Sequence, residues 1–98
     1  METMYKGNIN GPTTMLTSTI SATATSITVQ NGSVLPDAPN IAVIGSGNAA
    51  ETIVYGAKSG NTLNLVTRGF EGSPLPWPAN TEVVRRFTAY DYNALVDN

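Results

Sequence analysis

The chain has 98 residues, enough for one domain, and carries a net charge of −2 with only five basic residues. Such sparse basic residues argue against a nucleic-acid-binding surface, and no apolar run approaches the roughly 18 residues that span a bilayer. Cysteine and histidine are both missing, which removes disulfides, thiolate metal sites and the commonest general base. We therefore expect no enzyme, cofactor or metal site, no nucleic-acid or membrane partner, and synthesis in the cytoplasm.

Uncharged polar residues dominate the rest of the composition. Thirteen Thr, seven Ser and ten Asn disfavour long helices and favour strands joined by many turns. The predicted fold is all-β, a small antiparallel β-sandwich or partly open barrel with a short C-terminal helix. A small β domain without disulfides has a thin core, so we expect a homo-oligomer.

The first half of the chain predicts an arm followed by short strands. Residues 1–12, rich in Gly and Asn, form an expected extended arm ahead of a β domain over residues 13–88. Soft alternation predicts strands at residues 14–20 and 27–29. Residues 41–44 are continuously apolar and predict the central strand.

The clearest hairpin joins residues 52–55 to residues 62–67 through a turn at residues 59–61. Alternation places Leu63 and Leu65 on one face of the second strand. Further along the chain, residues 69–80 predict a Gly/Pro loop and residues 81–87 the last strand.

A short helix is predicted over residues 89–98. Thr88 fits the N-cap position, with Asp91 as the acid at the third helical position. Tyr92, Leu95 and Val96 then recur at helical spacing, and we expect this apolar face to form an oligomer interface.

Arg68 is the charge with the most structural promise, because it ends an apolar strand just before a glycine. One interpretation is a bidentate pair with Glu51 or Glu71 that braces the loop; the other is an anion site. Gly69 and Gly72 are expected to adopt backbone angles that other residues avoid.

Aromatic residues offer the other candidate contacts. Trp77, between two prolines, and Tyr55 are candidates for stacking on a sugar, although an aromatic ring in a small β domain more often packs against the core or an interface. Arg85 and Arg86 should lie on opposite strand faces, the inward one either paired or extended along apolar surface with its charge in water, and the outward one solvated.

An ordered set of short motifs runs through most of the chain: Val34-Leu35-Pro36, Glu51-Thr52-Ile53-Val54-Tyr55, Thr67-Arg68-Gly69, Glu71-Gly72, Trp77 and Phe87-Thr88-Ala89-Tyr90-Asp91. The set resembles a recurrent module in the tail, baseplate and fibre proteins of tailed bacteriophages. By length and layout it is similar in role to the N-terminal shoulder domain of siphophage receptor-binding proteins.

This resemblance implies a structural virion protein located in the tail, which anchors or assembles as a homotrimer with other tail or baseplate proteins. The neck and receptor-binding head of longer members do not follow in this sequence, and a short protein and a fragment of a longer fibre both stay open. The alternative function is a carbohydrate-binding module that contacts host surface polysaccharide through Trp77 and Tyr55.

Overall fold

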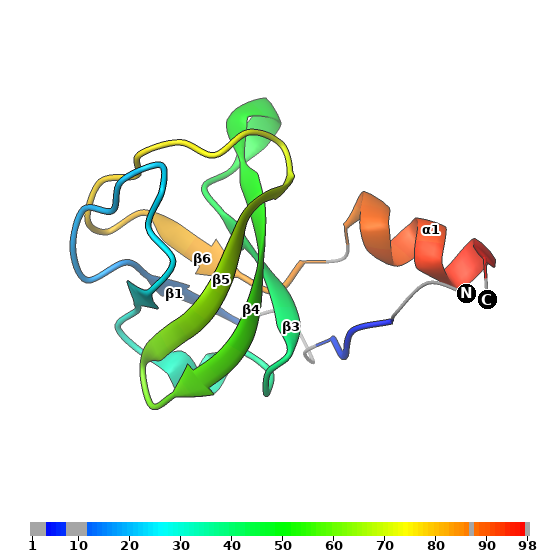
Figure 1. Cartoon of the computed structure of the whole chain (residues 1–98), viewed down its shortest axis with the longest axis horizontal. Coiled ribbons are helices and arrows are strands. Elements are labelled where there is room, and N and C mark those ends of the chain that lie inside the picture. Colours follow the sequence, from blue (N-terminus) through cyan, green and yellow to red (C-terminus); the bar gives the residue numbers. More distant parts are fainter. Residues whose placement is uncertain (1–3, 8–11, 87, 98) are drawn as a thin grey trace.

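The computed structural model describes residues 4–7, 12–86 and 88–97. These residues form a six-stranded antiparallel sheet, curled into a half-barrel, with one short helix to its side (Figure 1). The fold is therefore mostly β, as predicted from the sequence. The elements are β1 (Thr13–Met15), β2 (Ile27–Thr28), β3 (Asn40–Ile44), β4 (Glu51–Ser59), β5 (Thr62–Glu71), β6 (Glu82–Val84) and α1 (Ala89–Asp97).

The sheet has the order β1-β6-β3-β4-β5-β2, so its two edge strands come from the first third of the chain. Curling brings these edges together at an isolated bridge between Leu16 and Val29. On either side of the bridge, Gln30 N donates to Met15 O over 2.8 Å and Thr17 N to Thr28 O over 3.1 Å. The edge groups that would otherwise pair with another chain are thus partly used within the molecule.

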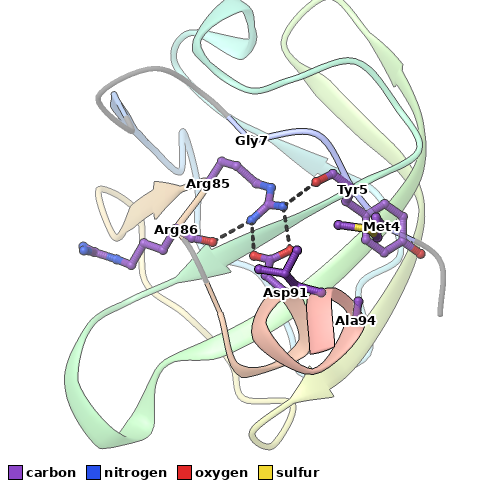
Figure 2. A pocket seen from close by; sticks show the side chains of 8 residues that line it. Met4, Tyr5, Gly7, Arg85, Arg86, Asp91 and Ala94 are labelled. Atoms are coloured by element: carbon purple, nitrogen blue, oxygen red, sulfur yellow. Dashed lines mark hydrogen bonds and ion pairs between the residues drawn. The ribbon is translucent and has the colours of Figure 1, made fainter. Parts of the chain in front are cut away.

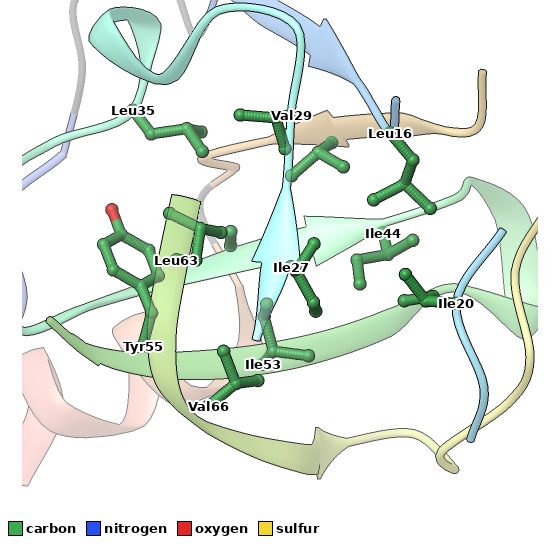
Figure 3. Close-up of a cluster of buried hydrophobic side chains, with 12 residues drawn as sticks. Leu16, Ile20, Ile27, Val29, Leu35, Ile44, Ile53, Tyr55, Leu63 and Val66 are labelled. Atoms are coloured by element: carbon green, nitrogen blue, oxygen red, sulfur yellow. The ribbon is translucent and has the colours of Figure 1, made fainter. Parts of the chain in front are cut away.

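The core fills the inside of the curl (Figure 3). β3 lies between β6 and β4, and all five of its residues are buried, as expected of a continuous apolar run in the middle of a sheet. The cluster draws on every part of the β domain: Leu16, Ile20, Ile27, Val29, Leu35, Ala42, Ile44, Ile53, Tyr55, Leu63, Val66 and Val83.

The predicted hairpin is present as β4 and β5, which pair from Ser59 and Thr62 outward. The prediction that Leu63 and Leu65 share a face is wrong. Leu63 is buried, whereas Leu65 has a φ of 53° and is 74% exposed. Its left-handed backbone breaks the alternation, and Val66 takes the next core position.

Strand boundaries also differ from the predicted ones. β5 continues to Glu71, three residues into the predicted loop, because a shift in its register with β4 accommodates Gly69 as a bulge. β1 ends at Met15 and β6 at Val84, each shorter than predicted. Phe87, the predicted end of the last strand, and most of the predicted arm lie outside the described residues.

α1 begins where the sequence predicts. Thr88 N donates to Asp91 Oδ2 over 2.9 Å, and Asp91 N donates back to Thr88 Oγ1 over 3.2 Å. This reciprocal pair is a capping box, with Asp in the place more often held by Glu, and it satisfies donors that the first turn of a helix leaves open.

Candidate functional site

The predicted ion pair between Arg68 and Glu51 is present and buried. Arg68 Nε donates to Glu51 Oε2 over 2.7 Å, and Nη2 donates to Oε1 over 2.8 Å, which is the bidentate geometry. The side chains are 6% and 0% exposed. Glu51 opens β4 and Arg68 stands in the irregular part of β5, so the pair crosses the hairpin at the end away from its turn.

Arg68 also reaches the loops on both sides of the hairpin. Its Nη1 donates to Ser21 O over 2.6 Å and to Ala24 O over 3.4 Å, and Nη2 donates to Leu75 O over 2.6 Å. With the two bonds to Glu51, five acceptors face the five N–H donors of the guanidinium. The anion-site interpretation loses its basis, because the protein itself occupies every donor.

The carboxylate of Glu51 also accepts hydrogen bonds from the Gly/Pro loop. Its carboxylate accepts from Gly69 N over 2.9 Å, Leu75 N over 3.2 Å and Trp77 Nε1 over 2.9 Å. Burial alone would raise the pKa of Glu51, but these bonds and those from Arg68 outweigh it and hold the pKa below its ordinary value. Glu51 is therefore a charged anchor for the loop and not a proton donor near neutral pH.

The two glycines of this region have the backbone angles that the sequence predicts, with φ of 63° at Gly69 and 75° at Gly72. A Cβ on Gly69 would come within 2.7 Å of Pro74 Cδ, and one on Gly72 within 2.7 Å of Ala50 O. Both positions therefore require glycine for conformation and for space.

Glu71 is not the partner of Arg68. Its Oε1 accepts from Thr52 Oγ1 over 2.9 Å, and its Oε2 accepts from Tyr90 N over 2.6 Å. The second bond reaches the first turn of α1, where a carboxylate also interacts favourably with the helix dipole. Glu71 thus ties the end of β5 to the start of the helix.

The structure argues against the candidate sugar contacts. Tyr55 is fully buried in the core, and its hydroxyl donates to Pro36 O over 2.6 Å, so of the two interpretations the structure favours packing in the core over contact with a sugar. Trp77 is partly buried against the same core. Its N–H is bonded to Glu51, and its ring lies so close to Gly45 that a Cβ there would stand 2.8 Å away.

A second buried ion pair joins Arg85 to Asp91 and was not predicted as a pair. Arg85 Nη1 donates to Asp91 Oδ2 over 2.7 Å and Nη2 to Oδ1 over 2.9 Å (Figure 2). Burial opposes ionisation of Asp91, but the bonds from Arg85 and Thr88 prevail and hold its pKa below the ordinary value. As expected for these two neighbouring arginines, Arg85 is inward and paired, while Arg86 is exposed and bonds to Glu82.

Arg85 also holds the N-terminal segment. Its Nη2 donates to Tyr5 O over 3.1 Å, and its Nε donates to Lys6 O over 3.1 Å and to Asn40 Oδ1 over 2.8 Å. Asn40 Nδ2 donates to the same Lys6 O over 2.9 Å. Residues 4–7 therefore lie against their own chain. The sequence signal for the Arg85–Asp91 pair, an arginine six residues before the helical acid, is weak by itself.

Three aromatic rings pack together where residues 4–7 and the end of β5 meet α1. The ring of Tyr90 lies 5.6 Å from that of Tyr5 and 4.8 Å from that of Phe70, measured between centroids. Both separations fall in the favourable range for tilted and edge-on pairs. Apolar contacts therefore add to the ionic ones where residues 4–7 and the end of β5 meet α1.

The outer face of α1 is exposed and apolar. Tyr92, Leu95 and Val96 are 58%, 57% and 63% exposed. Beside this face is a pocket of about 320 Å³ between residues 4–7 and the helix (Figure 2). Its lining consists of Met4, Tyr5, Gly7, Arg85, Arg86, Asp91, Ala94 and Leu95.

Among the described residues, no buried side-chain nitrogen or oxygen lacks a hydrogen-bond partner, and no group of three or more acidic side chains stands close enough together to hold a metal ion. In the same part of the chain, no helix has the length and apolar character needed to cross a membrane. Comparisons with family models, with curated proteins and with solved structures found no match to this chain.

Proposed function

We propose that this chain is a structural module that assembles by self-association through α1, in the tail tip, baseplate or fibre of a tailed bacteriophage. The observation that carries the proposal is the helix itself. α1 is fixed to the body on one face and presents an exposed apolar face, Tyr92, Leu95 and Val96, on the other.

The mounting of α1 supports a role in assembly. Contacts at Tyr90 and Asp91 hold its first turn: the bond from Tyr90 N to Glu71, the ion pair of Asp91 with Arg85, the cap by Thr88 and the rings of Phe70 and Tyr5. A helix held in this way keeps one direction relative to the sheet. An interface that is oriented before binding loses less conformational entropy on association.

The charge of the outer face supports a second copy of this chain as the partner. The exposed described side chains of α1 are uncharged, namely Ala89, Tyr92, Asn93, Leu95 and Val96. In a cyclic oligomer, residues near the axis meet their own copies, so a charge there would face a like charge. A face without charge avoids that repulsion, and the trimer implied by the resemblance has three such helices around one axis.

The phage assignment rests on the motifs alone. Labelled antibodies against the chain, applied to intact particles, test the assignment. Label at the tail of particles would support it, and label absent from particles that contain all other virion proteins would refute it.

Self-association is tested by a triple variant of the helix face, Tyr92→Ser with Leu95→Ser and Val96→Ser, in sedimentation equilibrium. We expect the wild type to sediment as a trimer and the triple variant as a monomer. Leu65→Asn is the control, because it removes an even more exposed apolar side chain from β5 and should leave the trimer intact. Equal loss of mass in the control and the triple variant would contradict a role specific to α1.

The carbohydrate-binding alternative is not favoured. Its two contact residues serve the fold, since Tyr55 is buried and Trp77 is bonded to Glu51. Trp77 is the single tryptophan of the chain, so its fluorescence reports directly on any sugar that reaches it. A spectral shift on titration with wall polysaccharide would reopen this alternative.

A further inference from the structure

We propose that the pocket between residues 4–7 and α1 receives the side chain of Tyr92 from a second copy of the chain. Each copy would then insert one ring and receive another. This inference rests on the proposed self-association through α1 and adds the contact that sets the orientation of one copy relative to the next.

The length of α1 shows why the helix face alone is a small interface. Nine residues at 1.5 Å of rise each span roughly 13 Å, less than two heptads of a coiled coil. Stable interfaces between proteins bury on the order of 1,200 Å² or more in total. A trimer built on this helix therefore needs further contact area directly beside it, and the pocket lies there.

The size and chemistry of the pocket fit an apolar side chain. Its volume of about 320 Å³ lies at the lower limit of the roughly 300–1,000 Å³ typical of small-molecule sites. Met4, Tyr5, Ala94 and Leu95 contribute apolar wall. The lining also holds three charged residues, each of them paired. Arg85 bonds to Asp91, Asn40 and three backbone carbonyls, so it has no donor left for an anionic ligand, and Arg86 bonds to Glu82.

Tyr92 is the side chain best placed to enter. It is the one aromatic residue on the exposed face of the described helix, and an aromatic ring carries large contact area at little cost in entropy. Leu95 belongs both to that face and to the pocket wall. Helices set side by side around an axis therefore bring Tyr92 of one copy to the pocket of the next.

Such a contact joins two different surfaces, a ring on one copy and a pocket on its neighbour. Head-to-tail contacts of this kind close into rings when the rotation allows it. The pocket wall is held in shape within each copy by the bonds from Arg85 to Tyr5 O and Lys6 O. The N-terminal segment would thus take part in assembly by forming the receiving site.

Filling the pocket tests the proposal. Gly7 lines it, and a Cβ on Gly7 would meet no atom within 4 Å. Gly7→Leu should therefore leave the melting temperature of the monomer unchanged and convert the trimer to monomer in light scattering. Ser59→Leu, which adds the same side chain at an exposed position at the end of β4, is the control and should remain trimeric.

The donor side is tested by Tyr92→Ala and Tyr92→Phe. We expect the alanine variant to raise the dissociation constant by on the order of tenfold or more, the effect of truncating a central interface aromatic, and the phenylalanine variant to bind like the wild type. If Gly7→Leu and Tyr92→Ala both remain trimeric while the triple helix variant dissociates, the pocket proposal is overturned and self-association through α1 stands. A wild type that stays monomeric overturns both.

Discussion

At the scale of single residues, the molecule depends on two arginines that lie deep in the fold. A bracing pair between Arg68 and a nearby carboxylate, either Glu51 or Glu71, was predictable, because a guanidinium at a strand end lies close to both when the strands form a hairpin. The choice of Glu51 over Glu71 was not predictable. It depends on the bulge at Gly69, which turns Glu71 toward α1.

Removal of Arg68 should damage folding before any binding. Arg68→Ala leaves the buried Glu51 carboxylate without its counter-charge, and breaking a buried pair in this way costs about 3–5 kcal/mol of unfolding free energy. Arg86→Ala removes the same charge from an exposed pair with Glu82 and should cost less than about 1 kcal/mol. Urea denaturation measures both. Wild-type stability in Arg68→Ala, together with loss of a ligand or partner, would mean that Arg68 binds rather than braces.

Acid should unfold the protein through the same carboxylates. The folded pKa values of Glu51 and Asp91 lie below their ordinary values of 4.5 and 3.8, so their contribution to stability is complete above those values and is lost as pH falls through the folded ones. We expect the unfolding free energy, measured in urea, to fall below about pH 5.

Two single variants identify the groups responsible for that acid dependence. Glu51→Gln should lower stability at pH 7 and flatten the dependence, because the group that titrates is gone. Glu82→Gln, at an exposed pair, should leave the dependence unchanged. An unfolding free energy that stays constant down to pH 3 in the wild type would contradict the assigned pKa shifts.

At the scale of elements, patterns of apolar residues located the strands, and local backbone angles decided where they deviate. The central strand and the hairpin follow from alternation and from the turn at Gly60, which has a φ of 60°. The exposure of Leu65 does not follow from alternation, because no sequence pattern predicts a left-handed leucine within a strand. The start of α1 was predictable because Thr88 and Asp91 form a local signal that needs no tertiary partner.

Relief of the unusual backbone at position 65 should stabilise the protein. A left-handed residue with a side chain costs roughly 1–2 kcal/mol, and asparagine tolerates this region better than leucine. Leu65→Asn should therefore raise the unfolding free energy by up to about 1 kcal/mol, measured by thermal or urea denaturation. A lower stability would show that the backbone cost at position 65 is smaller than the packing that the leucine side chain provides.

At the scale of the whole molecule, the curled sheet uses its edges on itself and leaves the helix as the element that reaches outward (Figure 1). Composition predicted the β architecture, and the homo-oligomer expected from the same composition stays a prediction. The sequence did not predict that residues 4–7 dock on Arg85, since the docking depends on backbone carbonyl groups and not on side-chain pattern.

We expect the braced β body to present α1 for assembly with copies of itself. Light scattering on the eluted wild-type chain, from low to high micromolar concentration, measures this most directly. We expect a mass that rises to three times the 10.3 kDa of one chain. A mass of one chain throughout that range would contradict it.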